Sequence, residues 1–387
     1  MLKSLAIANY RSIRQMALPL GRLNVITGAN GTGKSNLYKG LRLLAETARG
    51  GVIASLAWEG GFKSSRWAGP EIITARMKSG RAPVQAVRRL DPVNLRLGFC
   101  DENIGYAIDI GLPIPMTTAF ADDPEIKREI IFAAPAYRPG AVLVDRRNAL
   151  VRCRESRGEW STLSSRLQTF ESMLSELSDP RRAPEVTRIR DTVRSWRFYD
   201  HFATHRDAPA RQPVVATRTP VLAPDGRDLA AALETIREMG NGPALAATVD
   251  DAFPGATLRS IVSDGRLKVA FNQPGLLRGL SAAELSDGTL RFLLWAAALM
   301  TPRPPPLMVL NEPETSLHPD LLPALGRLII KAAESTQVWV VSHASRLLAT
   351  LREYQECNSI QLGKSLSESV VGQWGVLEEP RWKWPAR

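Results

Sequence analysis

Alternating and helically spaced apolar residues predict the order of elements in the first part of the chain. Residues 2–7 and 23–27 are short, mostly apolar stretches of the kind found in strands. A glycine-rich stretch follows at 28–35, and leucines at helical spacing directly after it predict a helix. Residues 93–112 alternate between apolar and polar positions on both sides of a polar turn, which predicts an antiparallel hairpin.

Two further runs with helical spacing, in the middle of the chain, predict a short helical hairpin. Apolar residues recur at helical intervals over 161–178 and again over 186–199, with a proline-containing turn between them. Each arm is at most roughly 30 Å long at 1.5 Å per residue, too short for a long coiled coil. The simplest role of such a hairpin is to cover a sheet edge. Residues 206–226 are rich in Pro, Arg and Thr and are expected to form a loop.

From residue 229 onward the pattern is regular again and mixes helices with buried strands. This mixture, without an internal repeat, places the chain in the α/β class. The predicted elements are helices at 229–239, 243–252 and 290–300, a strand-like region at 257–271, and strands at 307–310 and 338–341.

The charge of the chain is unusual, whereas its overall composition is ordinary. Hydrophobic residues make up 44% and charged residues 23%, as in soluble globular proteins, but the net charge is +11. Residues 138–218 contain 16 Arg, no Lys and 10 acidic residues, and so carry +6 of that charge. One guanidinium group can donate to two phosphate oxygens at once, so this Arg-rich stretch is a candidate DNA contact. A solvated surface in an Arg-biased protein explains the same charge equally well.

Several classes of protein do not fit the sequence. Cys100, Cys153 and Cys357 lie far apart and form no CxxC pair, which argues against a disulfide framework or a cysteine zinc site and favours the cytoplasm. No apolar run is long enough to span a membrane, and the first residues lack the apolar centre of a secretory signal. His201 and His205 are four apart, as on one face of a metal-binding helix, but no third ligand accompanies them, so a structural pair is the favoured interpretation.

The glycine-rich stretch 28–35 reads GANGTGKS and matches the pattern GxxxxGK followed by Ser or Thr. Its glycines let successive backbone N–H groups point into one concavity, and the following helix adds partial positive charge, a combination that holds a β-phosphate. Lys34 would reach the β- and γ-phosphates of ATP, and the Ser35 hydroxyl would bind Mg²⁺. The predicted ATP-binding residues here are Gly28, Ala29, Asn30, Gly31, Thr32, Gly33, Lys34 and Ser35.

Two predicted strands end in residues that suit phosphate chemistry. Residues 307–314 read LMVLNEPE, a buried strand followed by acidic residues, and ligands of open α/β sheets lie at such carboxyl ends. Glu312 is therefore the candidate for polarising the attacking water, although an acidic turn after a strand would look the same. His343 follows the strand at 338–341 and is placed to bond a γ-phosphate, where a structural histidine is the alternative.

A fourth pattern, LSDGT at 285–289, precedes the predicted helix at 290–300. Ser286 and Gly288 would offer a hydroxyl, backbone N–H groups and a helix N-terminus to an anion. By itself the pattern is an ordinary capped start of a helix. Its position ahead of the strand that leads to Glu312 favours the anion-binding interpretation.

The order P-loop, LSDGT, acidic strand end and histidine is similar to that of an ABC-type ATPase head, whose signature is usually written LSGGQ. With the run NEPETSLHP at 311–319, the chain resembles the bacterial AAA_21-type ATPases of the ABC-like group that includes RecF and SMC heads. The resemblance extends over nearly the whole chain, including ANYRS at 8–12 and DGRDL at 225–229. It implies a single P-loop NTPase head with an antiparallel β subdomain and the helical hairpin as an insert. The implied division is lobe one at about 1–150, the helical Arg-rich insert at about 151–218, and lobe two at about 219–387 with the signature, the acidic strand and the histidine.

The resemblance also implies how the site works. In that group two heads clamp two ATP molecules, and the signature of one head completes the site of the other. Ser286 and Gly288 would therefore act on ATP held by the P-loop of a second copy, so that a homodimer with ATP and Mg²⁺ as ligands is the expected state. His318 and Asp320 would lie in the D-loop region near the dimer seam.

Two features depart from the pattern of that family. The position before Glu312 is usually Asp, but here it is Asn311, whose amide oxygen can ligate Mg²⁺ without contributing charge. Weaker Mg²⁺ binding or slower turnover would follow. The Q-loop glutamine has no clear place, and Gln85 is the candidate. Tyr10 is a candidate for stacking on adenine, with packing in the core as the alternative.

The leading interpretation is a cytoplasmic ATPase that cycles between a closed ATP-bound dimer and an open form, with Lys34, Glu312 and His343 as catalytic residues. The closed form would grip DNA through the Arg-rich stretch 138–218, in genome maintenance or anti-phage defence. The alternative is a nucleotide-gated switch that binds a separate effector protein, with little hydrolysis and no DNA, and Asn311 favours this alternative. A GTPase or small-molecule kinase is disfavoured, because either would leave the signature-like pattern and His343 unexplained, and the chain has no Asn-Lys-x-Asp motif.

Overall fold

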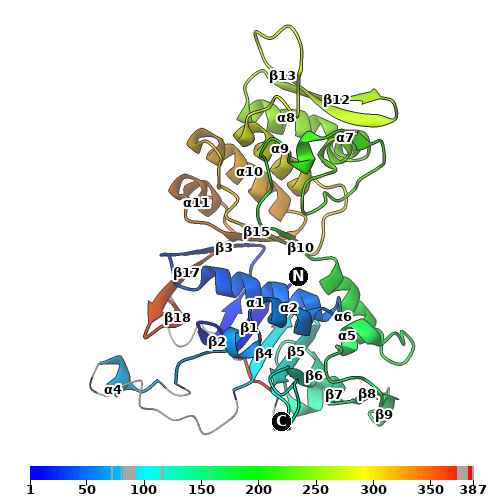
Figure 1. The fold of residues 1–387 in the computed structure, drawn as a ribbon, viewed down its shortest axis with the longest axis vertical. Helices are drawn as coiled ribbons and strands as arrows, with labels where there is room; N and C mark the ends of the chain where they lie inside the picture. Colours follow the sequence, from blue (N-terminus) through cyan, green and yellow to red (C-terminus); the bar gives the residue numbers. More distant parts are fainter. Residues whose placement is uncertain are drawn as a thin grey trace. The chain divides into compact units, whose positions relative to one another are not determined.

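The computed structural model divides the chain into two compact units, each built from segments that are far apart in the sequence (Figure 1). The first unit consists of Met1–Gly21, Thr27–Trp196 and Ile360–Arg387, and the second of Arg22–Ile26 and Arg197–Ser359. The structure describes residues 1–70, 73–79, 81, 93–114, 117–155, 157–372 and 382–385.

An eight-stranded antiparallel sheet organises the first unit. Its strand order is β2-β1-β4-β5-β6-β7-β8-β9. Leu95 on β4 lies opposite Ile110 on β5, so the hairpin predicted over 93–112 is confirmed. The strands are β1 (Ser4–Tyr10), β2 (Ile13–Pro19), β4 (Leu95–Cys100), β5 (Ile104–Gly111), β6 (Glu125–Ala133), β7 (Val142–Arg147), β8 (Leu150–Arg154) and β9 (Trp160–Ser164).

Helix α1 packs against this sheet and places the loop that precedes it. At Gly40 an added Cβ would lie 2.6 Å from the Cδ1 atom of Ile7 on β1, so glycine is what allows the helix to approach the strand. The helices of this unit are α1 (Lys34–Thr47), α2 (Val52–Trp58), α3 (Phe62–Ser65), α4 (Ala75–Lys78), α5 (Met173–Glu176), α6 (Pro184–Arg194) and the 3₁₀ turn η1 (Pro139–Ala141).

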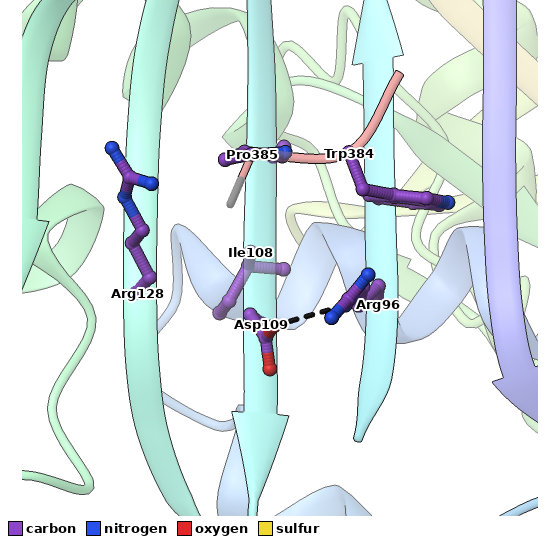
Figure 2. A pocket seen from close by; sticks show the side chains of 7 residues that line it. Arg96, Ile108, Asp109, Arg128, Trp384 and Pro385 are labelled. Atoms are coloured by element: carbon purple, nitrogen blue, oxygen red, sulfur yellow. Dashed lines mark hydrogen bonds and ion pairs between the residues drawn. The ribbon is translucent and has the colours of Figure 1, made fainter. Parts of the chain in front are cut away.

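Residues 382–385 lie against strands β4 to β6 of the same sheet (Figure 2). The ring of Trp382 comes so close to Gly98 that a Cβ there would lie 2.5 Å from the ring atom Cζ2. These residues therefore cover apolar sheet surface that would otherwise contact water. A small pocket beside them is lined by Arg96, Ala107, Ile108, Asp109, Arg128, Trp384 and Pro385.

The helix predicted over 161–178 is wrong, and the second arm, predicted over 186–199, is helical only as far as Arg194 in α6, because Arg197–Tyr199 form the strand β10. Residues 160–164 form the strand β9, and α5 is a single turn. The buried Arg146 donates to the carbonyl oxygens of Gln168, at 2.8 Å, and of Glu171. Those carbonyls would otherwise accept the i→i−4 bonds of a helix, so tertiary contacts override the apolar spacing.

Parallel strands and the helices after residue 229 form the second unit. The strands run in the order β10-β15-β16-β3, with β3 contributing its first residues to this unit. The helices and strands predicted after residue 229 are confirmed. They include α7 (Leu229–Met239), α8 (Gly242–Ala252), α9 (Asp287–Leu299), β15 (Leu307–Asn311), β16 (Gln337–Val341), and, beside them, α10 (Leu322–Ala333), α11 (Ser345–Arg352), β10 (Arg197–Tyr199), β3 (Leu23–Gly28), η2 (Pro209–Arg211) and η3 (Pro319–Leu321).

A small antiparallel sheet completes the second unit. The strand-like region predicted over 257–271 is the hairpin of β12 and β13, which turns at Asp264 and Gly265, both with positive φ. The strands of this sheet are β11 (Val214–Val215), β12 (Thr257–Ser263), β13 (Arg266–Asn272) and β14 (Leu280–Ser281). In the first unit, β17 (Cys357–Ser365) pairs with β18 (Glu368–Val371) through residues 362–371. Across the part of the chain that the structure describes, no helix combines the length and the apolar character needed to cross a bilayer.

Candidate functional site

The P-loop connects the end of β3 at Gly28 to the start of α1 at Lys34. Gly28 has φ +147° and Gly33 has φ +104°, and neither position has room for a side chain. A Cβ on Gly33 would lie 2.0 Å from the Ser369 Oγ, and one on Gly28 would lie 2.5 Å from the Leu362 carbonyl oxygen. Backbone conformation and close approach therefore both require glycine here.

The N-terminus of α1 is arranged to receive an anion. Its N-cap is Gly33 in the left-handed conformation, without a side-chain hydrogen bond, and its first turn contains no acidic residue. The first N–H groups of a helix have no partner in a preceding turn, and the helix dipole makes this end partly positive. These donors, in a glycine-rich loop, fit the phosphates of ATP.

The ammonium group of Lys34 lies across the loop. Its Nζ donates to the carbonyl oxygens of Gly28 at 2.6 Å and of Ala29 at 3.1 Å, and the Thr32 Oγ1 donates to the second of these at 2.8 Å. Lys34 is buried, and both of these partners are neutral. A buried cation with neutral partners favours the approach of an anion. The exposed residues of the loop are Ala29, Asn30, Gly31 and Ser35.

A polar cluster that was not predicted braces the P-loop. The Ser12 Oγ lies 2.6 Å from the Ser369 Oγ and accepts from the Asn36 Nδ2 at 2.7 Å. The backbone N–H of Ser369 also donates to the Ser12 carbonyl oxygen at 2.8 Å. Ser12 and Ser369 are 357 positions apart, so no local pattern could reveal the contact.

Tyr10 belongs to the core, as the alternative interpretation held. Its side chain is fully buried, and its hydroxyl donates to the Glu59 carboxylate at 2.8 Å, which Arg11 also binds at 2.8 Å. Burial, and secondarily the charge of Glu59, raise the pKa of Tyr10 above its ordinary value. Gln85, the Q-loop candidate, lies outside the described residues.

In the second unit, the predicted acid and the predicted histidine follow neighbouring parallel strands. Asn311 at the end of β15 lies opposite Val341 at the end of β16, so Glu312 and His343 come at the same edge of the sheet. The N–H of Glu312 donates to the Val341 carbonyl oxygen at 2.8 Å, and Glu312 has φ +48°, which is uncommon for a residue other than glycine. The structure brings these two residues to one edge, and their roles stay predictions.

Glu314 contacts the predicted histidine, although no role was predicted for it. Its Oε1 accepts from the Ser342 hydroxyl at 2.7 Å and from the His343 backbone N–H at 2.9 Å. The same oxygen lies 3.4 Å from the His343 Nδ1. The available signal was the second carboxylate of the NEPE run.

The D-loop candidates His318 and Asp320 are both exposed.

Ser286 and Gly288, the predicted signature residues, lie at the start of α9. Ser286 is the N-cap, and its Oγ accepts from the Thr289 N–H at 3.2 Å. The helix begins at Asp287, so Gly288 already lies in its first turn. The capping interpretation therefore describes this structure, and an added role toward an anion stays a prediction.

Arg211 holds the backbone that precedes α9. Its guanidinium donates at 2.8 Å to the carbonyl oxygens of Ala282 and Leu285 and at 2.7 Å to the Asp287 carboxylate. Its side chain is only 7% exposed. Arg211 was counted in the Arg-rich stretch as a possible DNA contact, but its donors bind the protein itself.

Several other arginines of the stretch 138–218 also bind protein groups. Arg146 is buried, Arg190 donates to the Leu177 carbonyl oxygen at 3.1 Å, and Arg194 donates to the Ala48 carbonyl oxygen at 2.7 Å. The sum of charges along the sequence therefore overstates the basic surface. The exposed arginines of this stretch are Arg138, Arg147, Arg154, Arg157, Arg166, Arg181, Arg182, Arg188, Arg194, Arg206 and Arg218.

The shared helix face predicted for His201 and His205 is wrong. Both residues lie in an irregular segment between β10 and η2. The Nε2 of His201 lies 3.4 Å from a guanidinium nitrogen of Arg291, and burial, followed by the charge of Arg291, lowers the pKa of this histidine. His201 itself is exposed, and its ring contacts the buried Arg291.

Comparison with solved structures gives matches to SMC heads at low identity. One is the SMC head bound to the C-terminal winged-helix domain of ScpA, 13% identical, covering 97% of this chain and 98% of that chain with a TM-score of 0.48. The SMC head domain from Thermotoga maritima is 15% identical, covering 97% and 99% with a TM-score of 0.45. An SMC head with an extended coiled coil, bound to the C-terminal domain of ScpA derived from Pyrococcus furiosus, is 12% identical, covering 97% of each chain with a TM-score of 0.47.

Comparison with protein-family models identifies one family that this chain matches. The family model AAA_21, described as "AAA domain, putative AbiEii toxin, Type IV TA system", matches residues 23–128 and 163–349. Comparison with curated proteins gives no match. The two matched segments span well over half of the chain and contain the P-loop, the signature-like turn, the acidic strand end and the histidine. The chain therefore belongs to the AAA_21 family of P-loop ATPases.

Proposed function

We propose that this protein binds ATP with Mg²⁺ and hydrolyses ATP to ADP and phosphate. The observation that carries the proposal is the start of α1, where an uncapped helix N-terminus follows a loop of positive-φ glycines. Lys34, buried and bonded to neutral carbonyls, supplies the cation for the β- and γ-phosphates. The backbone N–H groups of the loop would hold the β-phosphate.

Further proposed roles in hydrolysis and in Mg²⁺ binding fall to Glu312, His343, Ser35 and Asn311. Glu312 would orient and polarise the attacking water, and His343 would contact the γ-phosphate. Ser35 and Asn311 are the residues proposed, from the family pattern, as ligands of Mg²⁺, which when bound would neutralise charge on the phosphates. Because the amide of Asn311 carries no charge, we expect weaker Mg²⁺ binding than an aspartate would provide.

The proposal extends to a homodimer that acts on DNA in the cytoplasm. In a closed dimer, Ser286 and Gly288 would face ATP bound to the other copy. Exposed arginines of the stretch 138–218 would contact DNA phosphates, which makes binding weaken steeply with salt. Genome maintenance or anti-phage defence is the proposed setting.

The test is steady-state ATP hydrolysis by the purified protein, with and without duplex DNA. Glu312→Gln should abolish hydrolysis while leaving ATP binding intact. Glu353→Gln is the matched control, because Glu353 is an exposed glutamate at the end of α11. If Glu312→Gln still hydrolyses ATP, Glu312 has no part in the mechanism. If DNA does not change the rate of hydrolysis, the result counts against a dimer that grips DNA.

A second candidate function is a nucleotide-gated switch that holds a separate effector protein and hydrolyses little ATP. The observation that favours it is Asn311 at the end of β15, where a charged Mg²⁺ ligand would be expected. Asn311→Asp should then raise hydrolysis above that of the natural protein. Hydrolysis that falls in this variant would contradict the switch interpretation.

A further inference from the structure

The carboxylate of Glu314 is buried at the carboxyl edge of the parallel strands in the second unit. Its side chain is 6% exposed, and its Oε1 accepts from the Ser342 hydroxyl and the His343 backbone N–H. The second oxygen, Oε2, is also buried and has no hydrogen-bond partner in the described part of the chain. A buried carboxylate bound only by neutral donors is costly, so it favours a nearby positive charge.

The imidazole of His343 is the group that can provide this charge. Its Nδ1 lies 3.4 Å from the Glu314 Oε1, and within the described residues no lysine or arginine is at ion-pair distance from that carboxylate. The His343 side chain is 61% exposed. With Nδ1 beside Glu314, the other ring nitrogen, Nε2, is the one left to bind a ligand.

We propose that Glu314 is a positioning residue that keeps a proton on the Nδ1 of His343. Three groups of the strand end, the Ser342 hydroxyl, the His343 N–H and the His343 ring, lie around one carboxylate oxygen, so the ring is oriented relative to the sheet edge. A ring nitrogen donates only when it carries a proton, so the proton on Nδ1 determines how Nε2 can act. When Nε2 carries a proton as well, it can donate to a phosphate oxygen.

This inference rests on the proposed function for the purpose of the ring, because His343 is assigned to the γ-phosphate there. The arrangement itself is a property of the folded unit and can be measured without nucleotide. A neutral ring with its proton on Nε2 alone would place an unprotonated Nδ1 3.4 Å from the Glu314 carboxylate, which is unfavourable. The protonation of Nδ1 is therefore the measurable consequence.

The first experiment is nitrogen NMR of the whole protein with labelled histidines, in the absence of nucleotide. The chain has 4 histidines, and His343→Gln identifies the signal of interest. We expect the His343 Nδ1 to have the chemical shift of a protonated nitrogen in the natural protein. A neutral ring protonated only on Nε2 would overturn the proposal, and this result needs no variant of Glu314.

The second experiment compares two glutamates of the same loop. Glu314→Gln keeps the shape of the side chain but removes its charge, so the His343 Nδ1 signal should shift toward that of an unprotonated ring nitrogen. Glu312→Gln is the control, because Glu312 is exposed and, in the described part of the chain, forms no ion pair or hydrogen bond with the His343 ring, so the His343 signals should not move. Identical His343 spectra in the natural protein and Glu314→Gln would overturn the proposal.

Kinetics separate this inference from the proposed function. In an enzyme where a carboxylate orients a catalytic histidine, removing that charge lowers kcat by up to about 10⁴-fold. We expect Glu314→Gln to lower kcat by at least about 10-fold with little change in KM, because the effect is on the transition state. A protein without any ATP hydrolysis would refute the proposed function and leave the NMR result standing. Unchanged kcat in Glu314→Gln would instead refute the role of Glu314 alone.

Discussion

Replacing Arg146 with methionine should strongly destabilise the first unit. Arg146 and Glu129 form an ion pair in which both side chains are 0% exposed. The same guanidinium donates to the carbonyl oxygens of Asn148 at 2.9 Å, Gln168 at 2.8 Å and Glu171. Methionine fills a similar volume but supplies no donor, so one buried charge and three carbonyls lose a partner.

The size of the effect follows from the surroundings of Glu129. Removing one partner of a buried ion pair costs about 3–5 kcal/mol of unfolding free energy, because the other charge stays buried. Tyr106 and Ser172 still donate to Glu129 at 2.6 Å each, which keeps the expected loss within this range. For a domain of about 150–250 residues, 1 kcal/mol corresponds to about 2–4 °C in Tm, so the transition of the first unit should fall by roughly 6–20 °C.

Thermal unfolding by calorimetry measures this prediction directly. Arg147→Met is the matched control, because Arg147 is 53% exposed and its partner Asp145 keeps a second ion pair with Arg128 at 2.8 Å. The control should cost less than about 1 kcal/mol. Adding Glu129→Gln to Arg146→Met should recover part of the loss, because no charge then stays buried. If Arg146→Met and Arg147→Met unfold at the same temperature, the reasoning about the buried pair is refuted.

Three further variants test other features of the structure. Burial raises the pKa of Tyr199 from 10.0 to about 12, so its contribution to the free energy of unfolding is complete below pH 10 and is lost as the pH rises toward 12. Tyr199→Phe should flatten this decline when the free energy of unfolding in urea is measured against pH, and an equally steep decline in the variant would contradict the raised pKa of Tyr199. Arg211→Met should speed hydrogen exchange in the loop before α9, whereas the exposed Arg218→Met should not, and equal exchange in both would show that Arg211 does not hold the loop. Gly33→Ala should abolish ATP binding because its Cβ would meet a serine hydroxyl, while Gly140→Ala, where the space is open, should bind normally; binding retained in Gly33→Ala would contradict the loop geometry.

The parts of the candidate site that depend on local backbone could be predicted from the sequence. The P-loop needs glycine where φ is positive, and Gly33 before Lys34 shows this in the sequence itself. Glu312 and His343 could be placed at one edge because parallel strands end on the same side of a sheet. The contact of Glu314 with His343 could not, because side-chain contacts across two strands leave no periodic signal.

The fold shows the same division between local and long-range causes. The helix predicted from residue 229 to about residue 239 is α7, Leu229–Met239, whose apolar residues at helical spacing are mostly buried. Over 161–178 the spacing was misleading, because Arg146 takes backbone carbonyls that a helix would use. The role of Arg211 was also hidden, because a count of charges cannot separate a buried guanidinium from a solvated one.

The contact between Ser12 and Ser369 has a consequence for how the protein is made. The P-loop lies against β18, where Gly33 closely approaches Ser369 and Ser369 bonds Ser12. A ribosome delivers the P-loop early and β18 more than 330 residues later. At the usual rate of about 5–20 residues per second, this interval lasts on the order of 20–70 seconds. A nascent chain therefore carries a complete P-loop sequence long before it has a braced nucleotide site.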